Sequence, residues 1–371
     1  MEKFTLIFAI GVILGCNSIA QDIYKKEYVK ELMERVNTYQ FSHSRKEYDD
    51  NWIRGTYYAG VMACYLATED EQFLTQSENF CQSLKWSLPA GKAGSSGGGG
   101  NLLTCGQTMI ECYFEDKKKS KIENIINHLE NPELKNPIGQ ALTWHYESGR
   151  MYVDAIFTGP PTLAMLHKAT KDERYLQWMD HFVWSIYGRL YDDKENLFYR
   201  DIRFRDGALN EENVAQDKKV IWSRGNGWAI AGIARVLRYL PQDHGSYTKY
   251  EMVMQNMAMA LKDCQSEEGF WYPNLVDPDH VRLKETSGTS FFIYGLAYGV
   301  NNGILDRAEY IPVIKKAWKS VCDEISEEGK VQWGQLVGDR PVNLSKDDSH
   351  EYVSGTFLLA ASEIYKMNFN Q

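Results

Sequence analysis

Apolar residues recur at three- and four-residue spacing along most of the chain, whereas strand-like alternation is sparse. This spacing places apolar side chains on one face of a helix. The pattern predicts an all-α fold of about twelve helices, with ends uncertain by a few residues. They lie near residues 24–41, 51–67, 70–84, 103–116, 119–130, 152–169, 172–188, 226–239, 246–264, 288–302, 309–326 and 350–366.

The predicted helices form pairs whose connections are alike. The segments 68–74 and 170–176 both contain a Thr and an Asp that can cap the next helix, followed by acidic residues in its first turn. The other helices of the pairs open instead with glycine and aromatic residues, at 52–58, 222–228, 285–291 and 350–357. Self-similar helical hairpins stack into an open solenoid or a closed ring, and about twelve helices suit a closed, double-layered ring.

No change of composition divides the chain, so residues 21–371 are predicted to form a single domain. The longest irregular segments are 86–101, 131–150, 189–221 and 266–287, and segments of this length in a compact domain are usually functional. The glycine run at 97–100 follows no strand and precedes no Lys-Ser or Lys-Thr. It therefore predicts a surface loop or a lid rather than a phosphate-binding loop.

The charge balance limits the choice of partner. The formal net charge is −9 and no basic stripe is present, which disfavours nucleic acid. An anionic substrate would therefore need a local basic site. The 23 Tyr, 15 Phe and 10 Trp residues suit a cleft that binds sugars, and they suit a large aromatic core equally well.

The first twenty residues have the features of a signal peptide. Lys3 precedes an apolar stretch over residues 4–14, and small residues at 18–20 form a cleavage site before Gln21. The stretch is too short to span a bilayer, so we expect export to the periplasm or the medium and no transmembrane span. In a second interpretation, Cys16 ends a lipoprotein cleavage box and carries a lipid anchor.

The sequence has no sign of a metal or cofactor site. The six cysteines after residue 20 are scattered, without a C-x-x-C pair or zinc spacing, and predict buried thiols, with disulfides left open. There is no G-x-S-x-G elbow (the matching letters at 94–98 lie in the glycine-rich loop), no H-E-x-x-H pair and no dinucleotide G-x-G-x-x-G that opens a helix after a strand. A pair of catalytic carboxylates, as ordinary glycosidases use, stays open among 50 acidic residues.

Two segments carry the strongest candidate chemistry. Asp154 follows Val153 and precedes apolar residues, and a carboxyl buried in such surroundings has a raised pKa and can donate a proton. The alternative is an Asp that caps a helix. In the segment 222–228, the indoles of Trp222 and Trp228 can stack on a sugar, and Arg224 can bind a carboxylate; a structural turn is the alternative.

Three further polar residues are weaker candidates. Arg200 and His145 lie in long loops among aromatic residues, where they could line a cleft or simply face solvent. His350 opens the last predicted helix, where it could bind substrate or belong to the cap.

At these residues the chain resembles glycoside hydrolase family 105, the unsaturated rhamnogalacturonyl hydrolases, and more distantly family 88. The matching segments are 153–161, 222–228, 285–290 and 352–360, in the order found in the family. The resemblance covers nearly the whole mature chain and implies an (α/α)6 barrel, in agreement with the helix count.

The resemblance also implies a reaction. Polysaccharide lyases leave a sugar with a C4=C5 double bond at the non-reducing end, and the family hydrates it. By this match Asp154 protonates C4 and then accepts a proton from the water that attacks C5. Family members commonly carry an Asp five residues before the Gly-Gln pair that matches 106–107, where this chain has Asn101. Asn can hydrogen-bond a hydroxyl but supplies no charge.

The main hypothesis is therefore an exported hydrolase of anionic, unsaturated uronyl oligosaccharides that acts after a lyase. Its substrate would be a rhamnogalacturonan fragment of pectin or a sulfated ulvan fragment. For a sulfate group, Arg200, Arg203 and Arg205 are available, although they could equally be a solvated loop. The alternatives are a non-catalytic sugar-binding protein on the same fold and an (α/α)6 polysaccharide lyase.

Overall fold

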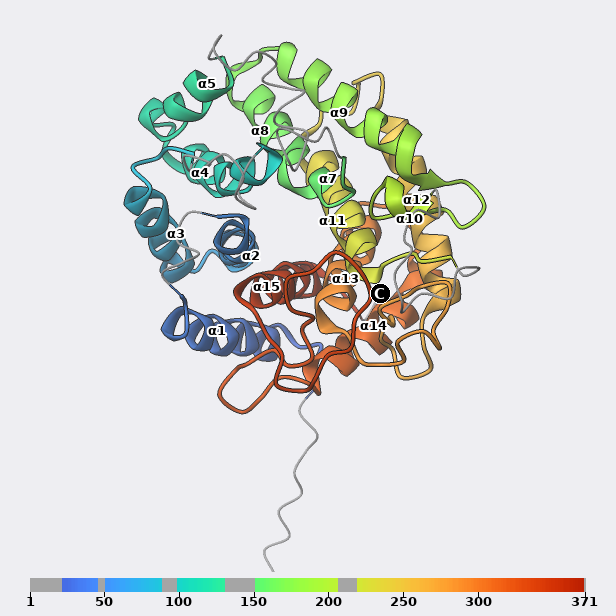
Figure 1. Ribbon diagram of the computed structural model, residues 1–371. Coiled ribbons are helices and arrows are strands. Elements are labelled where there is room, and N and C mark those ends of the chain that lie inside the picture. The colour runs from blue at the N-terminus through green and yellow to red at the C-terminus, as the bar shows by residue number, and fades with distance from the viewer. Residues whose placement is uncertain (1–21, 46–50, 89–98, 131–150, 206–218, 370–371) are drawn as a thin grey trace, which may run out of the picture.

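The computed structural model describes residues 22–45, 51–88, 99–130, 151–205 and 219–369, and within them the helices form two concentric layers (Figure 1). The inner layer comprises α2 (Trp52–Thr68), α4 (Leu103–Asp116), α7 (Ala155–Thr158) with α8 (Pro160–Thr170), α11 (Ser223–Tyr239), α13 (Thr286–Asn301) and α15 (Glu351–Lys366). The outer layer comprises α1 (Lys26–Ser42), α3 (Glu71–Ser83), α5 (Glu123–Leu129), α9 (Arg174–Leu190), α12 (Tyr247–Cys264) and α14 (Arg307–Cys322). Each inner helix contacts the next, and α15 contacts α2, which closes the ring. The fold is an (α/α)6 barrel, as predicted.

The two layers differ in their apolar patterns. Every residue of α13 from Thr286 to Val300 is buried, because this helix packs against neighbours on all sides. On α9 the buried residues form one stripe, which includes Tyr175, Met179, Phe182 and Ile186. A single apolar stripe suits a helix with one face on the core and the other in water.

Glycines allow the inner helices to pack closely. A Cβ atom on Gly60 of α2 would lie 2.4 Å from the carbonyl oxygen of Gly355 on α15. A Cβ atom on Gly355 would in turn lie 2.5 Å from the carbonyl oxygen of Thr56. The two backbones therefore meet at a distance that excludes any larger residue, and this contact closes the ring.

The predicted helices agree with the observed ones, but two of the predicted segments are divided. The segment 119–130 forms the 3-10 helix at 119–121 and then α5. The segment 152–169 is divided into α7 and α8 at Gly159, and Pro160 is the first residue of α8. Proline has no backbone N–H to continue a helix, but it suits a first helical position. The similar connections are also confirmed. Thr68 accepts a hydrogen bond from the N–H of Asp70 (3.3 Å), and Thr170 accepts the equivalent bond from Asp172 (3.2 Å).

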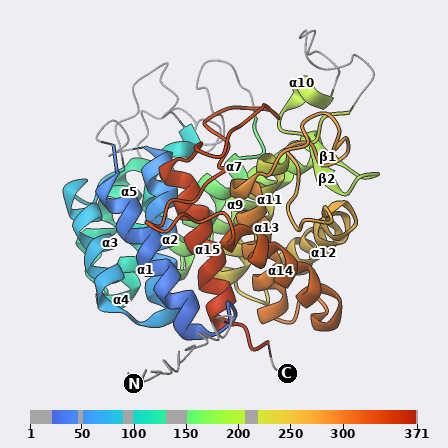
Figure 2. The same ribbon diagram turned by 90° about the horizontal axis from the view of Figure 1, so that it is seen from below.

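Most of the smaller elements gather at one end of the barrel. They are η2 (Gly99–Leu102), α10 (Ile202–Arg205) and the antiparallel strands β1 (Tyr191–Asp192) and β2 (Leu197–Phe198). The short helix η3 (Lys119–Lys121) instead follows the C-terminal end of α4. In the side view α7, α10 and the two strands lie at the same end (Figure 2). The first turns of the inner helices meet here, where Trp52 lies 5.8 Å from Trp228 and 5.4 Å from Tyr352 between ring centroids. We call this the site end, because residues that open different inner helices converge there.

Buried charges cross the barrel in the C-terminal halves of the inner helices. Arg235 and Glu111 are each 1% exposed and pair at 2.9 Å. Glu363 pairs with Arg238 and, at 3.0 Å, with Lys366. Burial alone would raise the pKa of the Glu363 carboxyl, but the charges of Arg238 and Lys366 lower it to about 2.

This depressed pKa predicts a loss of stability in acid. Glu363 binds its proton more weakly in the folded chain than in the unfolded chain. Its contribution to the free energy of unfolding is therefore complete above about pH 4.5 and disappears as the pH falls towards 2. When urea unfolding is measured between these pH values, the free energy of unfolding of a Glu363→Gln variant should depend less on pH than that of the wild type. If the free energy of unfolding changed equally with pH in both proteins, the lowered pKa of Glu363 would be contradicted.

No helix in the described ranges is long and apolar enough to cross a membrane. All six cysteines between residues 64 and 322 are free, and four of them are buried. The predicted signal peptide, Cys16 and residues 97 and 98 of the glycine run lie outside the described residues.

Candidate active site

Asp154 lies at the site end, directly before α7, and is 5% exposed. It occupies the N-cap position of this helix, but its side chain makes no capping hydrogen bond. Its Oδ2 atom is buried and accepts no hydrogen bond from the described residues. Burial raises the pKa of the carboxyl above its ordinary value, although the nearby charges of Arg200 and Arg224 oppose this. Such a carboxyl retains its proton to higher pH and can donate it.

Arg200 is the nearest cation to this carboxyl. Its Nε atom lies 3.4 Å from Oδ2 of Asp154, and the two side chains are 6% and 7% exposed. The guanidinium carbon stacks 3.8 Å from the ring centroid of Tyr152. The backbone N–H of Val153 donates to the carbonyl of Arg200 at 3.0 Å, which joins the segment before α7 to the segment after β2. The structure therefore brings two of the predicted site residues together.

Charges of alternating sign extend from Arg200 to the rim of the barrel. Asp201 accepts a hydrogen bond from Nη1 of Arg200 at 2.7 Å and one from Nη2 of Arg203 at 2.8 Å. Arg203 also binds Asp339 at 2.9 Å, and Asp339 accepts a hydrogen bond from Arg340 at 2.8 Å. The sequence had singled out Asp154, Arg200 and Arg203 but not Asp339 or Arg340. We call Asp154, Arg200, Asp201, Arg203, Asp339 and Arg340 the charge chain.

Arg224 holds a segment that we call the strap, residues 335–340. Its Nη1 atom donates to the carbonyls of Gln335 (2.6 Å) and Leu336 (3.1 Å) and to the hydroxyl of Tyr352. Its Nη2 atom donates to the carbonyl of Gly338 at 3.2 Å. Arg224 is 2% exposed, and its guanidinium is largely engaged by the protein itself. The predicted contact with a substrate carboxylate stays a prediction.

The two predicted tryptophans are buried within the protein. Trp222 stacks on the Arg224 guanidinium at 4.4 Å and donates to the side chain of Gln335 at 2.9 Å. Trp228 packs on Phe291 with 4.4 Å between ring centroids and on Phe157 with 5.1 Å. Both rings shape the site end, and their stacking on a sugar stays a prediction.

The remaining predicted residues lie in different places. Asn101 is buried in η2, just before α4. His350 is the N-cap of α15, and its Nδ1 atom accepts a hydrogen bond from the N–H of Glu351 at 3.0 Å. Burial and the charges of Arg45 and Arg224 lower the pKa of His350 to about 4, so it is neutral near pH 7. His145 lies outside the described residues.

Other acids at the site end are already engaged. Oε1 of Glu285 accepts the N–H of Ser287 at 2.9 Å, and Oε2 accepts the N–H of Gly288 at 2.6 Å, which caps α13. Asp201 and Asp339 belong to the charge chain. Arg205, one of the arginines considered for a sulfate, donates to the carbonyl of Arg189 at 2.5 Å. Asp154 is thus distinguished from these neighbouring acids by a buried oxygen that accepts no hydrogen bond from the described residues.

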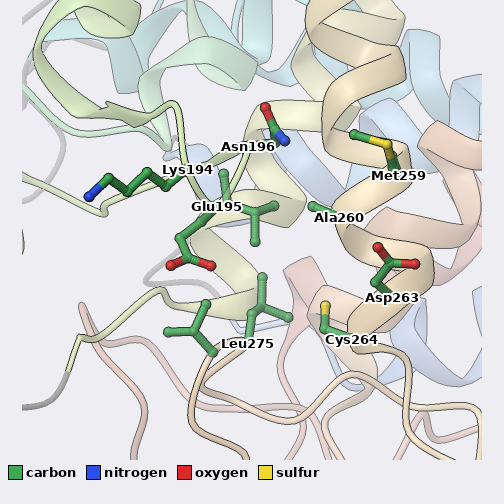
Figure 3. Close-up of a pocket in the computed structure, with 10 residues that line it drawn as sticks. Lys194, Glu195, Asn196, Met259, Ala260, Asp263, Cys264 and Leu275 are labelled. Carbon is green, nitrogen blue, oxygen red and sulfur yellow. The ribbon is translucent and has the colours of Figure 1, made fainter.

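Of two pockets in the described structure, one includes a predicted site residue and the other includes none. One, of 280 Å³, is lined by His350 together with His43, Arg45 and Lys330. The other, of 320 Å³, lies between the turn after β1 and α12, where Glu195, Asp263 and Cys264 surround it (Figure 3). None of the predicted site residues lines this second pocket. In the described ranges, no group of three His, Cys, Asp or Glu residues could hold a metal ion.

A model of Glycosyl Hydrolase Family 88 matches residues 24–368. The chain belongs to this family. A curated relative, the unsaturated 3S-rhamnoglycuronyl hydrolase of Formosa agariphila, is 30% identical over 381 residues, which cover 99% of this chain and 98% of the relative. The family 88 member is therefore a glycosidase.

Two solved structures share the fold over most of the chain. A family 88 glycosyl hydrolase from Bacteroides vulgatus is 27% identical with a TM-score of 0.80, covering 92% of this chain and all of that one. A protein described as a polysaccharide lyase is 26% identical with a TM-score of 0.79, covering 92% of this chain and 97% of that one. The resemblance stated from the sequence is confirmed at the level of the family.

Proposed function

We propose that this family 88 glycosidase is exported and removes a 4,5-unsaturated uronic acid from the non-reducing end of oligosaccharides made by a lyase. The observation that carries the proposal is the buried Oδ2 atom of Asp154, which accepts no hydrogen bond from the described residues and lies 3.4 Å from Nε of Arg200. Of the two substrates considered, the name of the Formosa agariphila relative favours an unsaturated uronyl group on a 3-sulfated rhamnose over a pectic fragment.

The chemistry needs a single carboxyl group. Asp154 donates its proton to C4, and C5 develops positive charge that the ring oxygen stabilises. Water then attacks C5 and returns a proton to the Asp154 carboxylate. The hemiketal opens to a ketone at C5, and the hemiacetal left at C1 expels the rest of the oligosaccharide as an alcohol. The nearby acids are held by helix N–H groups or arginines, which supports a mechanism with one carboxyl.

The geometry near Asp154 also suits an anionic sugar. The uronate carboxylate is attached to C5, next to the carbon that is protonated, so its partner must lie close to the catalytic acid. Arg200 satisfies this condition with 3.4 Å between Nε and Oδ2. A guanidinium at this place can neutralise the carboxylate when the sugar binds.

The proposal predicts consumption of the double bond, which absorbs in the ultraviolet because it is conjugated with the carboxylate. Purified protein should remove this absorbance from lyase-treated ulvan and leave lyase-treated pectin and glycosaminoglycan fragments largely unchanged. A rise of absorbance on intact polysaccharide would instead establish the lyase that one structural relative suggests. Binding without any change would establish a sugar-binding protein.

A further inference from the structure

Asp201 is the most completely engaged acid near the catalytic carboxyl. It is 1% exposed. Its Oδ1 atom accepts the backbone N–H of Arg203 at 3.0 Å and the Nε–H of the same residue at 2.9 Å. Its Oδ2 atom accepts one bond from Arg200 and another from Arg203. Asp201 therefore lies between two guanidinium groups, of which only Arg200 contacts Asp154.

We propose that Asp201 is a positioning residue for the reaction: it holds the Arg200 guanidinium against Asp154 and takes up part of its positive charge. This inference rests on the proposed function and adds a residue to which the sequence had assigned no role in the reaction. Asp201 itself does not touch the reacting sugar. It acts through Arg200, whose Nη1 atom faces Asp201 while its Nε atom faces Asp154.

The charge on Arg200 is shared among Asp154, Asp201 and, at 3.9 Å, Asp339, and Asp201 is the nearest of the three. If Asp201 is neutral, Arg200 interacts more strongly with Asp154 and favours its ionised form. If Asp201 loses Arg203 instead, its negative charge is less compensated, and it draws Arg200 away from Asp154. The other groups that face Asp154, namely Arg224 from α11 and the high-pKa hydroxyl of Tyr352 from α15, are the same in both cases.

Two variants should therefore change the pH profile in opposite directions. Asp154 must be protonated to act as the acid, so kcat falls as the pH rises through the pKa of Asp154. Asp201→Asn should move the midpoint of this fall to lower pH by about one unit, and Arg203→Gln should move it to higher pH. We expect the main effect on kcat rather than KM. The profiles are measured with the unsaturated oligosaccharide by loss of ultraviolet absorbance.

A matched control is available on the neighbouring hairpin. Asp192 also binds a cation, Lys219 at 2.8 Å, but it belongs to β1 and makes no contact with Arg200 or Asp154 in the described structure. Asp192→Asn should keep the wild-type midpoint. A shift of this control equal to that of Asp201→Asn would show a non-specific effect of lost charge and would overturn the proposal.

The remaining outcomes are decisive. Unchanged midpoints, or shifts of the same sign in Asp201→Asn and Arg203→Gln, would refute the positioning role. If Asp201→Asn does not fold, Arg203→Gln still tests the role, because Arg203 is on the rim with a side chain 25% exposed. If the wild type consumes no double bond, the proposed function fails. The positioning role of Asp201 is then tested separately, by carbon NMR titration of the Asp154 carboxyl in the same variants.

Discussion

Asp154→Asn is expected to lower kcat by roughly 10³-fold while leaving the fold unchanged. The amide has nearly the volume of the carboxyl, but it has no acidic proton to give to C4 and no negative charge to recover one from water. The side chain makes no capping hydrogen bond to α7, so its replacement removes no helix cap. Loss of absorbance of the double bond gives kcat, and thermal unfolding gives the stability.

Asp306→Asn is a suitable control for this prediction. Asp306 caps α14 in the outer layer, where its side chain accepts the N–H of Glu309 at 2.9 Å. Asn caps helices about as well as Asp, so both the activity and the melting temperature should stay close to those of the wild type. If Asp154→Asn retained a tenth or more of the activity, another group would have to supply the proton.

Arg224→Ala is expected to reduce the free energy of unfolding by about 3 kcal/mol, because it removes a charged donor from several buried acceptors. The strap carbonyls of Leu336 and Gly338 would lose the bonds from Arg224, and that of Gln335 would keep only the hydroxyl of Tyr352. Since the strap also carries Asp339 of the charge chain, we expect KM to rise as well. Urea unfolding and steady-state kinetics measure the two effects.

The two measurements distinguish two roles for Arg224. A direct contact with the uronate, as the sequence predicted, would raise KM with little loss of stability. An anchor for the strap lowers stability together with affinity. Arg282→Ala removes the same charge from a side chain that is 70% exposed, and it should change neither quantity. Wild-type stability and KM in Arg224→Ala would exclude both roles.

The helical architecture could be predicted because it depends on local patterns. The twelve apolar segments and the capped connections are determined by neighbouring residues. The break at Gly159-Pro160 was missed, because the apolar spacing continues through it even though proline marks the start of a new helix. Asp154 could also be found, because an acid among apolar residues is costly to bury without a function. Its pairing with Arg200 connects two segments that are 46 positions apart, and no local pattern indicates it.

The strap could not be predicted for the same reason. Residues 335–340 have no helical period and were not among the long segments singled out as functional. Their contacts depend on Arg224, more than 100 positions earlier in the chain, and on Arg203, which is 136 positions from Asp339. Such contacts become visible only when the ring closes and brings the starts of α11 and α15 together.

The common direction of the inner helices has an electrostatic consequence. Each helix has a partial positive charge at its N-terminus, from backbone N–H groups that no helical carbonyl accepts. Because the inner helices all begin at the site end, their dipoles add in the space around Asp154. A protein with a formal net charge of −9 can thus present a locally positive field to an anionic sugar. This field originates in the backbone, and no substitution of a single arginine would abolish it.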